Sequence, residues 1–310
     1  MDKIALTVEN LTKVYLKNRR KEISEKALNN LSFQVKQGEI FGLLGPNGAG
    51  KTTFLSILGG TVIKTEGKVN VWGFDLDKNP RQVRASIGIV PQEVNLDAFF
   101  SPKSLLELQA GLYGVPKKKR ITEAILNMVS LSKQADTYSR SLSGGMKRRL
   151  LIAKAMVHQP PILVLDEPTA GVDVELRKNL WDNVKELNKQ GVTIILTTHY
   201  LSEAQKMCDR IAIINKGNLV ALDTTEKLLE KIQTKKATFK VKRFNGKKDF
   251  NVNGAKFFIN SDNSITVSYD KKSSNFSDIL NHLRENGVEI QDISTDDGDL
   301  EDVFVQLTND

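Results

Sequence analysis

The chain has 310 residues, 40% of them hydrophobic and 26% charged, and a formal net charge of +8. This length allows one large and one small domain with an ample core. The only cysteine is Cys208, which excludes a disulfide within the chain and is typical of a reducing cytosol. The basic charge alone would permit a nucleic-acid partner, but no recognition-helix pattern or aromatic-interleaved basic face is visible, so we expect none.

The chain opens directly into an alternating strand, with no charged-then-apolar signal segment before it. No apolar run approaches the roughly 18 residues that a membrane-spanning helix needs. If the protein serves a transport process, we therefore expect the membrane path to lie in another chain.

Strand patterns at residues 4–8, 31–35, 39–44 and 68–71 mark the first part of the chain. The third of these strands leads into a loop made of Gly45, Pro46, Asn47, Gly48, Ala49, Gly50, Lys51, Thr52 and Thr53, and a helix pattern follows. The loop fits Gly-x-x-x-x-Gly-Lys-Ser/Thr in its required strand, loop and helix context. The glycines let backbone amides converge on phosphate, Lys51 adds charge, and Thr52 offers its hydroxyl to Mg²⁺. The sequence thus predicts a nucleotide site.

A helical region follows the strand at residues 87–90, which leads to Gln92. From about residue 93 to residue 159 the apolar residues recur at helical spacing. Within this region Ser143 is a good N-cap, and Gly144 and Gly145 leave backbone amides open at a helix start. Such a start favours phosphate, although an ordinary capped helix would show the same pattern.

An acidic pair, Asp166 and Glu167, ends the unbroken apolar run at residues 162–165. Such a run is typical of a parallel strand covered on both faces, and ligands of open α/β sheets lie at the carboxyl ends of strands. We therefore expect Asp166 to hold Mg²⁺ and Glu167 to take a proton from an attacking water. Strands at residues 192–196 and 211–214 and a hairpin turn at 215–218 follow.

From residue 234 the pattern changes to that of a small α+β domain. Alternation at residues 239–242 and 265–269 predicts strands, and apolar spacing at 276–283 and 300–307 predicts helices, with a strand at 288–293 between them. Residues 234–310 carry 11 basic and 13 acidic residues, so the basic excess lies in the first part. We expect domains at residues 1–233 and 234–310.

The run Leu142-Ser143-Gly144-Gly145-Met146, together with the loop and the acidic pair, resembles the motif set of ABC ATPases over about residues 4–232. The resemblance implies a P-loop NTPase (RecA-like) α/β core with a β-subdomain and a helical insert at about residues 93–159. Met146 and the segment at 170–173 are typical of the type-2 exporter branch, which includes drug, polysaccharide and lipid-linked exporters. The acidic ending at residues 300–304 also resembles this branch, in which such tails are regulatory or make dimer contacts. The alternative is that the tail only stabilises the fold and has no regulatory role.

The resemblance also implies individual roles. Tyr15 matches the aromatic that stacks on adenine, Gln92 the glutamine that senses metal and γ-phosphate, Asp173 the dimer-contact aspartate, and His199 the switch histidine. The basic stretch after Tyr15 is longer than this branch usually has. The alternative to a stacking role is therefore that Tyr15 is simply an exposed tyrosine at the end of a strand. We thus expect catalysis by Glu167, His199 and Gln92, ATP at Tyr15, residues 45–53 and Ser143, Gly144 and Gly145, and Mg²⁺ at Thr52, Gln92 and Asp166.

The function that follows is the ATP-binding and ATP-hydrolysing subunit of an ABC exporter. It would act peripherally at the cytoplasmic face of the inner (plasma) membrane, as a homodimer, with its helical insert docked on a separate multispanning permease. The alternatives are an importer ATPase subunit, a soluble ABC ATPase of translation or DNA repair, and a nucleotide-binding regulator without turnover. The transported substrate, the direction and the identity of the permease are left open by the sequence.

Overall fold

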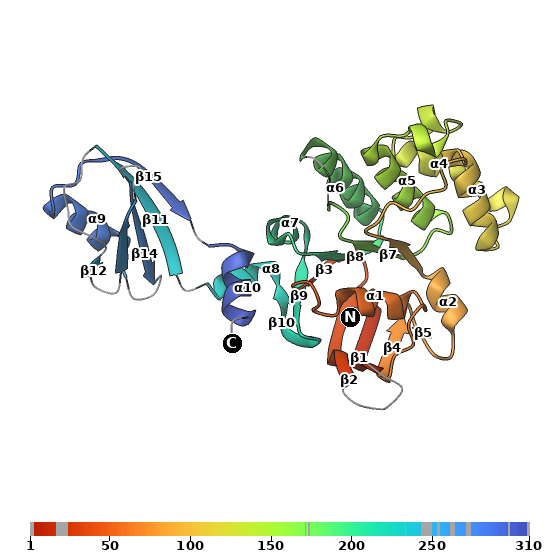
Figure 1. The fold of residues 1–310 in the computed structure, drawn as a ribbon, viewed down its shortest axis with the longest axis horizontal. Coiled ribbons are helices and arrows are strands. Elements are labelled where there is room, and N and C mark those ends of the chain that lie inside the picture. The colour runs from red at the N-terminus through yellow and green to blue at the C-terminus, as the bar shows by residue number, and fades with distance from the viewer. Residues whose placement is uncertain are drawn as a thin grey trace. The chain divides into compact units, whose positions relative to one another are not determined.

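The computed structural model describes residues 3–16, 24–170, 172, 174–232, 234–242, 250–252, 255–260, 264–270, 274–296 and 298–308. Gly171 and Asp173 lie outside the described residues, as does most of the basic stretch after Tyr15. The chain divides into two units, one ending at Asp223 and one beginning at Thr224 (Figure 1). Residues 224–232 therefore belong to the second unit, whereas the sequence placed the boundary between residues 233 and 234.

The first unit contains a six-stranded sheet with the order β10-β9-β3-β8-β7-β6. Its strands are β3 (Ile40–Leu44), β6 (Ile87–Val90), β7 (Ile162–Asp166), β8 (Thr193–Thr198), β9 (Arg210–Asn215) and β10 (Asn218–Thr224). Strand β3 runs parallel to β8 and β9, and β7 runs parallel to β6 and β8. Every residue of β3 and β8 is buried, as expected of apolar runs covered on both faces. The pairs Leu44 with Thr198 and Asp166 with Thr197 place the carboxyl ends of β3, β7 and β8 side by side.

Helix α6 (Val174–Lys189) connects β7 to β8, and α7 (Leu201–Met207) connects β8 to β9. Helix α1 (Lys51–Leu58) follows β3. Cys208 follows α7 and is only 6% exposed. It packs closely on β3, because a Cβ added at Gly42 would lie 3.0 Å from its Sγ atom. A glycine at this point of β3 therefore lets the segment after α7 approach the sheet.

A second, four-stranded sheet has the order β2-β1-β4-β5. Its strands are β1 (Ile4–Leu16), β2 (Ser24–Lys36), β4 (Glu66–Val71) and β5 (Phe74–Asp75), and the short helix α2 (Pro80–Ala85) follows. Strands β1 and β2 are longer than their patterns predicted. Register shifts interrupt their pairing, and Asn10 and Asn30 have positive φ angles of 49° and 50°, which disturbs the period-two alternation. Phe33 of β2 stacks on Phe41 of β3 with ring centroids 5.4 Å apart, so the two sheets share one core.

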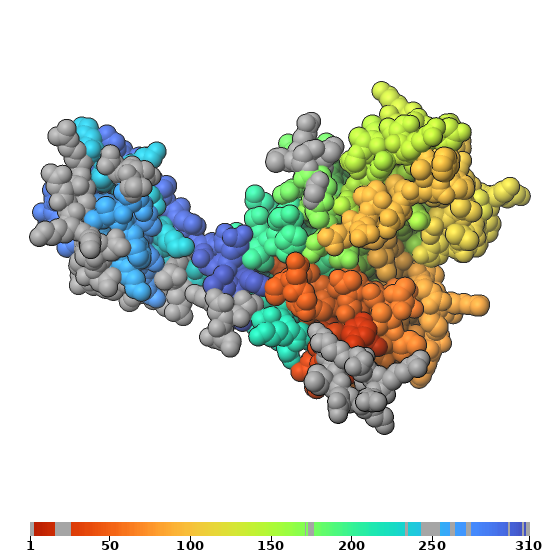
Figure 2. Space-filling model, in the orientation of Figure 1, coloured from red at the N-terminus to blue at the C-terminus, as the bar shows by residue number. Residues whose placement is uncertain are grey.

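The helical region expected within residues 93–159 contains α3 (Pro102–Leu112), α4 (Thr122–Met128) and α5 (Gly144–Met156). Short 3₁₀ turns lie at Lys117–Lys119, Ser132–Gln134 and Ser139–Ser141. Ser101 caps α3 by accepting a hydrogen bond from the backbone amide of Ser104. Within the first unit these helices form one side, and the four-stranded sheet of β1, β2, β4 and β5 forms another (Figure 2).

The second unit contains an antiparallel sheet with the order β12-β13-β14-β11-β15. Its elements are α8 (Thr225–Glu230), β11 (Thr234–Val241), β12 (Phe250–Val252), β13 (Ala255–Ile259), β14 (Ser264–Asp270), α9 (Phe276–Glu285), β15 (Ile290–Asp296) and α10 (Leu300–Thr308). Helix α9 covers one face, where Ile279 and Leu283 pack on Phe239 and Phe257. Helix α10 returns to lie beside α8, which explains why residues 224–232 belong to this unit.

None of the helices in the described parts of the chain is long and apolar enough to cross a bilayer.

Candidate active site

The phosphate-binding loop joins β3 to α1, and two of its glycines have no room for a side chain. A Cβ at Gly45 would lie 2.3 Å from the carbonyl oxygen of Ile214, and one at Gly50 would lie 2.4 Å from that of Ala27. Gly50 also has a φ angle of 108°, which only glycine adopts readily. The loop therefore depends on these glycines for its path as well as for its open amides.

Lys51 is only 6% exposed, and its Nζ atom donates to the carbonyl oxygens of Gly45 at 2.6 Å and Pro46 at 3.2 Å. Burial lowers the pKa of Lys51, and the carboxylates of Glu167 and Asp166 oppose that shift. A cation so placed in the phosphate-binding loop is suited to the outer phosphates of a nucleotide.

A cleft of about 820 Å³ opens over this loop, which is ample room for a nucleotide. It gathers most of the residues that the sequence singled out. The lining consists of Tyr15, Lys26, Ala27, Pro46, Asn47, Gly48, Ala49, Gly50, Lys51, Thr52, Thr53, Gln92, Glu167, His199 and Lys216. Gly45 and Asp166 are not among the lining residues. Ser143, Gly144 and Gly145 are not part of it.

Glu167 is the residue on which the site converges. Its Oε2 atom accepts a hydrogen bond from Gln92 Nε2 at 3.0 Å, and its Oε1 atom lies 3.1 Å from His199 Nδ1 and 4.0 Å from Lys51 Nζ. The residue is 8% exposed. Its backbone has a φ of 43°, in the sparsely populated left-handed region, and its amide donates to the carbonyl of Thr197. A carboxylate with these neighbours has a fixed orientation beside the loop.

Asp166 ends β7 and is oriented by Thr197, whose hydroxyl donates to Asp166 Oδ1 at 2.6 Å. Burial raises the pKa of Asp166 above its ordinary value, the Thr197 hydrogen bond opposes the shift, and the neighbouring Glu167 carboxylate adds to it. This placement favours the approach of a cation, which would relieve the cost of the buried charge.

The donor atoms present suit Mg²⁺ only if a bound nucleotide supplies further ligands. Among the described residues no three His, Cys, Asp or Glu side chains cluster as a metal cage. The hydroxyl of Thr52, the amide of Gln92 and the carboxylate of Asp166 are hard oxygen donors, and Mg²⁺ is commonly held by one or two carboxylates plus substrate phosphates. The set therefore fits a metal shared between protein and phosphate.

Tyr15 lies at the edge of the cleft and is 40% exposed. Lys13 stands over one face of its ring, with Nζ 4.8 Å from the ring centroid, while the same ammonium donates to the carbonyl of Ile63 at 2.8 Å. A lysine so fixed steadies the phenol ring. The opposite ring face is the one suited to stacking on a base.

Helix α5 begins at Ser143, whose hydroxyl accepts from the amide of Met146 at 3.3 Å, as expected of an N-cap. A Cβ added at Gly144 would meet no atom within 4 Å, so this helix start is open. It does not line the cleft of its own chain. The resemblance to ABC ATPases implies this separation, because in that family each half of the site faces the counterpart in the partner subunit.

Lys26 and Lys216 line the cleft but were not singled out from the sequence. Lys216 comes from the turn between β9 and β10, where the amide of Gly217 donates to the carbonyl of Ala49 at 3.0 Å. The hairpin turn was expected from the sequence, but nothing local indicated that it would meet the phosphate loop.

The sequence profile of the ABC transporter family matches residues 28–170. The chain is 39% identical over 230 residues to the linearmycin resistance ATP-binding protein LnrL of Bacillus subtilis (strain 168), a match that covers 73% of this chain and 71% of the relative. The chain belongs to the ABC transporter ATP-binding family. This ABC ATPase is also 41% identical over 214 residues to the Nod factor export ATP-binding protein I of Rhizobium sp. (strain N33), over 68% of this chain and 70% of the relative.

Solved structures of ABC ATP-binding cassettes also resemble this chain. An ATP-binding subunit of an ABC transporter superposes with a TM-score of 0.63 at 26% identity, covering 73% of this chain and 92% of the other. A dimeric ATP-binding cassette in a post-hydrolysis state, bound to ADP and Pi, superposes with a TM-score of 0.62 at 27% identity, covering 71% and 98%. The P-loop NTPase fold and the ATP-binding and ATP-hydrolysing function expected from the sequence are confirmed.

Proposed function

We propose that this ABC ATPase drives export through a separate multispanning membrane subunit, from the cytoplasmic face of the inner (plasma) membrane. The hydrolysis part of the proposal is carried by the convergence of Gln92, His199 and Lys51 on Glu167 beside the phosphate loop. Relatives named for export and for linearmycin resistance support the direction.

In the hydrolysis step that we propose, a water attacks the γ-phosphorus of ATP and the bond from that phosphorus to the bridging oxygen breaks. Glu167 takes the proton of the water, and ADP leaves with the bridging oxygen. His199 and Gln92 orient the Glu167 carboxylate, and Lys51 and the loop amides bind the phosphates. Mg²⁺, held by Thr52, Gln92 and Asp166, would supply charge neutralisation when bound.

We further propose that each nucleotide lies between two copies of the chain. Ser143, Gly144 and Gly145 form an open helix start that does not line the cleft of their own chain, so their amides are available to the nucleotide of a partner copy. The dimeric cassette among the structural relatives supports this arrangement.

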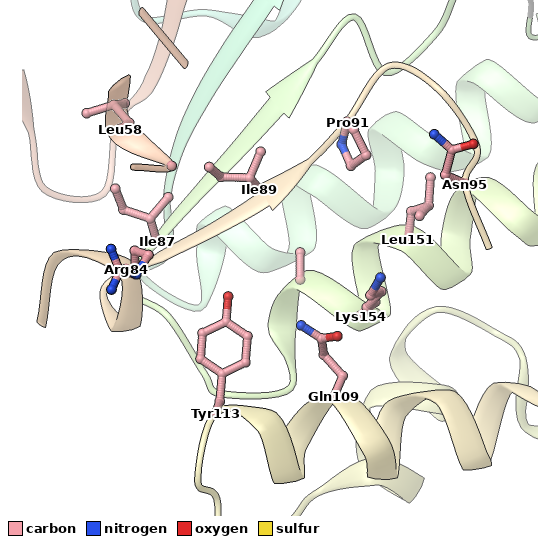
Figure 3. Close-up of a pocket in the computed structure, with 12 residues that line it drawn as sticks. Leu58, Arg84, Ile87, Ile89, Pro91, Asn95, Gln109, Tyr113, Leu151 and Lys154 are labelled. Carbon is pink, nitrogen blue, oxygen red and sulfur yellow. The ribbon is translucent and has the colours of Figure 1, made fainter. Parts of the chain in front are cut away.

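A groove of about 380 Å³ supports the docking of a membrane subunit. Gln109 of α3 and Tyr113, which directly follows this helix, face Leu151 and Lys154 of α5 and the strand β6 across it (Figure 3). Its floor is apolar, and its charged side chains are Arg84 and Lys154. Leu108 and Leu112 on α3 are 48% and 75% exposed. We expect a short helix of the membrane subunit, with apolar residues and a carboxylate, to bind here.

Copurification from membranes tests the proposal. The tagged full chain should retain a multispanning protein, and the charge reversal Lys154→Glu should weaken that retention while basal ATP hydrolysis stays within about twofold. Lys118→Glu is the matched control, because Lys118 is exposed and lies outside the groove. Retention of no multispanning protein would contradict the transport proposal. Equal retention by Lys154→Glu would contradict the assignment of the groove only.

A further inference from the structure

A network of side chains centred on a buried carboxylate adjoins the catalytic residues and has no part in the mechanism described above. Its centre is Glu203 on α7, which is 6% exposed. Glu203 Oε2 accepts a hydrogen bond from the hydroxyl of Thr169 at 2.7 Å, and Oε1 lies 3.2 Å from Nη1 of Arg177. Thr169 is fully buried and stands two residues after Glu167. The network therefore begins on the segment that carries the catalytic carboxylate.

Arg177 extends the network from α6 in two directions. Its Nη2 atom donates to the carbonyl of Val172 at 3.2 Å, and its guanidinium stands over the ring of Tyr200, 5.2 Å from the centroid. One side chain thus contacts both the segment after Glu167 and the segment after β8. A planar guanidinium with several donors can do this, whereas a lysine ammonium cannot reproduce the geometry.

Tyr200 returns the network to the active site. Its ring lies against that of His199, with centroids 4.2 Å apart and planes inclined by 36°. His199 Nδ1 in turn lies 3.1 Å from Glu167 Oε1. The contacts therefore close into a ring that starts at Glu167, passes through His199, Tyr200, Arg177, Glu203 and Thr169, and returns along the backbone.

We propose that Arg177, Glu203 and Thr169 are positioning residues for ATP hydrolysis, which set the catalytic carboxylate of Glu167 against His199. The inference rests on the proposed roles of those two residues. Glu167 has a backbone φ of 43°, and a residue in this region keeps its conformation only where its surroundings determine it. The ring of contacts provides that determination from outside the nucleotide cleft. It acts on the hydrolysis step and leaves phosphate binding by the loop intact.

Substitutions that break the ring without touching the cleft test this role in the full chain. Arg177→Gln removes the charge and the guanidinium donors, whereas Arg177→Lys keeps the charge. Thr169→Val removes the hydroxyl, whereas Thr169→Ser keeps it. Lys178→Gln is the matched control, since Lys178 is the exposed neighbour on the same helix. For each variant the turnover number, the KM for ATP, the affinity for a fluorescent ATP analogue and the melting temperature are measured.

Arg177→Gln and Thr169→Val should lower kcat about 10- to 100-fold, because a misplaced catalytic group costs rate. Analogue affinity should change less than about threefold, and Thr169→Ser should recover most of the rate. Arg177→Lys should recover part of it, and Lys178→Gln should match the parent. Equal losses of kcat and analogue affinity, loss of rate only in variants that melt early, or an unchanged kcat would each overturn the proposal. If Glu167→Gln kept the parental rate, the proposed role of Glu167 would fail instead.

Discussion

The guanidinium of Arg148 donates a hydrogen bond to the backbone carbonyl of Gln92, and through this contact the helix that starts at Ser143 reaches the active-site glutamine. The same side chain donates to the carbonyls of Pro91 at 3.2 Å and Ala170 at 3.3 Å. Arg148 is 5% exposed. One buried residue of α5 therefore joins the segment that follows β6 to the segment that follows β7.

Replacing Arg148 with Met should destabilise the protein by about 2–4 kcal/mol, because three carbonyl oxygens lose a charged donor in a buried place. Urea unfolding of the nucleotide-free chain measures this loss. Lys147→Met, one residue earlier on the same helix, should change stability by less than about 0.5 kcal/mol. If the two variants unfolded at the same urea concentration, the Arg148 contacts would contribute nothing to stability.

Replacing Glu167 with Gln should lower the ATP hydrolysis rate by about 10²- to 10⁴-fold, because an amide cannot take a proton from water. Binding of ATP should persist, since the loop and Lys51 are unchanged. A phosphate-release assay and a nucleotide-binding titration measure the two effects separately. Parental turnover in this variant would show that another group acts as the base.

Replacing Asp166 with Asn should raise the melting temperature of the nucleotide-free protein at neutral pH, by about 2–4 °C, and abolish hydrolysis. The folded-state pKa of Asp166 is raised by burial, so ionising this carboxyl opposes folding at every pH above that pKa. The gain should shrink as the pH falls towards about 3.9, the ordinary value for aspartate, below which both states are protonated.

The exposed Asp182 on α6 provides the control for that experiment. Asp182→Asn should leave the melting temperature unchanged across the same pH range. A gain for Asp166→Asn that persisted undiminished in acid would contradict the electrostatic explanation and point to packing.

Mixing two inactive variants tests the shared site. A chain with Lys51→Ala keeps its Ser143 helix start, and a chain with Ser143→Arg keeps its phosphate loop, so each mixed dimer should contain one intact site. Equal amounts should recover about one quarter of the parental rate, because about half of the dimers are mixed and each has one good site of two. Steady-state ATPase assays of the mixture and of each variant alone measure this.

The informative control is a mixture of Lys51→Ala with Glu167→Gln. Both lesions fall in the same half of the site, so no mixed dimer has an intact one and no rate should return. Recovery in this control, or full activity in a lone monomer, would rule out the two-chain site.

The part of the site that the sequence predicted consists of residues that are near one another along the chain or that end buried strands. Gly45, Gly50 and Lys51 belong to one loop whose path is set locally. Asp166 and Glu167 follow a strand that is apolar because both of its faces are covered, which makes the strand end recognisable. Parallel pairing of β3, β7 and β8 then brings these ends together.

The ring behind the catalytic pair could not be predicted, because its members follow no motif. Arg177 and Glu203 lie on different helices, and an arginine on an amphipathic helix usually indicates a solvated face. Their pairing depends on how α6 and α7 pack on the sheet. The same is true of Lys13, whose position over Tyr15 depends on the carbonyl of Ile63 from a distant turn.

In the second unit, alternation identified β11 and β14 and helical spacing identified α9 and α10. The strands β12 and β13 were missed, and β13 shows why: Ala255 and Phe257 are buried while Phe258 is exposed, so apolar residues lie on both of its faces and the alternation is lost. The packing of α10 beside α8 joins residues more than 70 positions apart, which a local pattern cannot indicate.

The single thiol of this chain, buried against β3, makes the protein ready for site-specific labelling. Burial raises the pKa of Cys208, and only a thiolate reacts quickly with maleimides and related probes. One cysteine introduced at an exposed residue, such as Leu112 beside the groove, would therefore carry the fluorophore or spin label alone. Distances between two such labels on paired copies could then be followed through the ATP cycle without first removing the native cysteine.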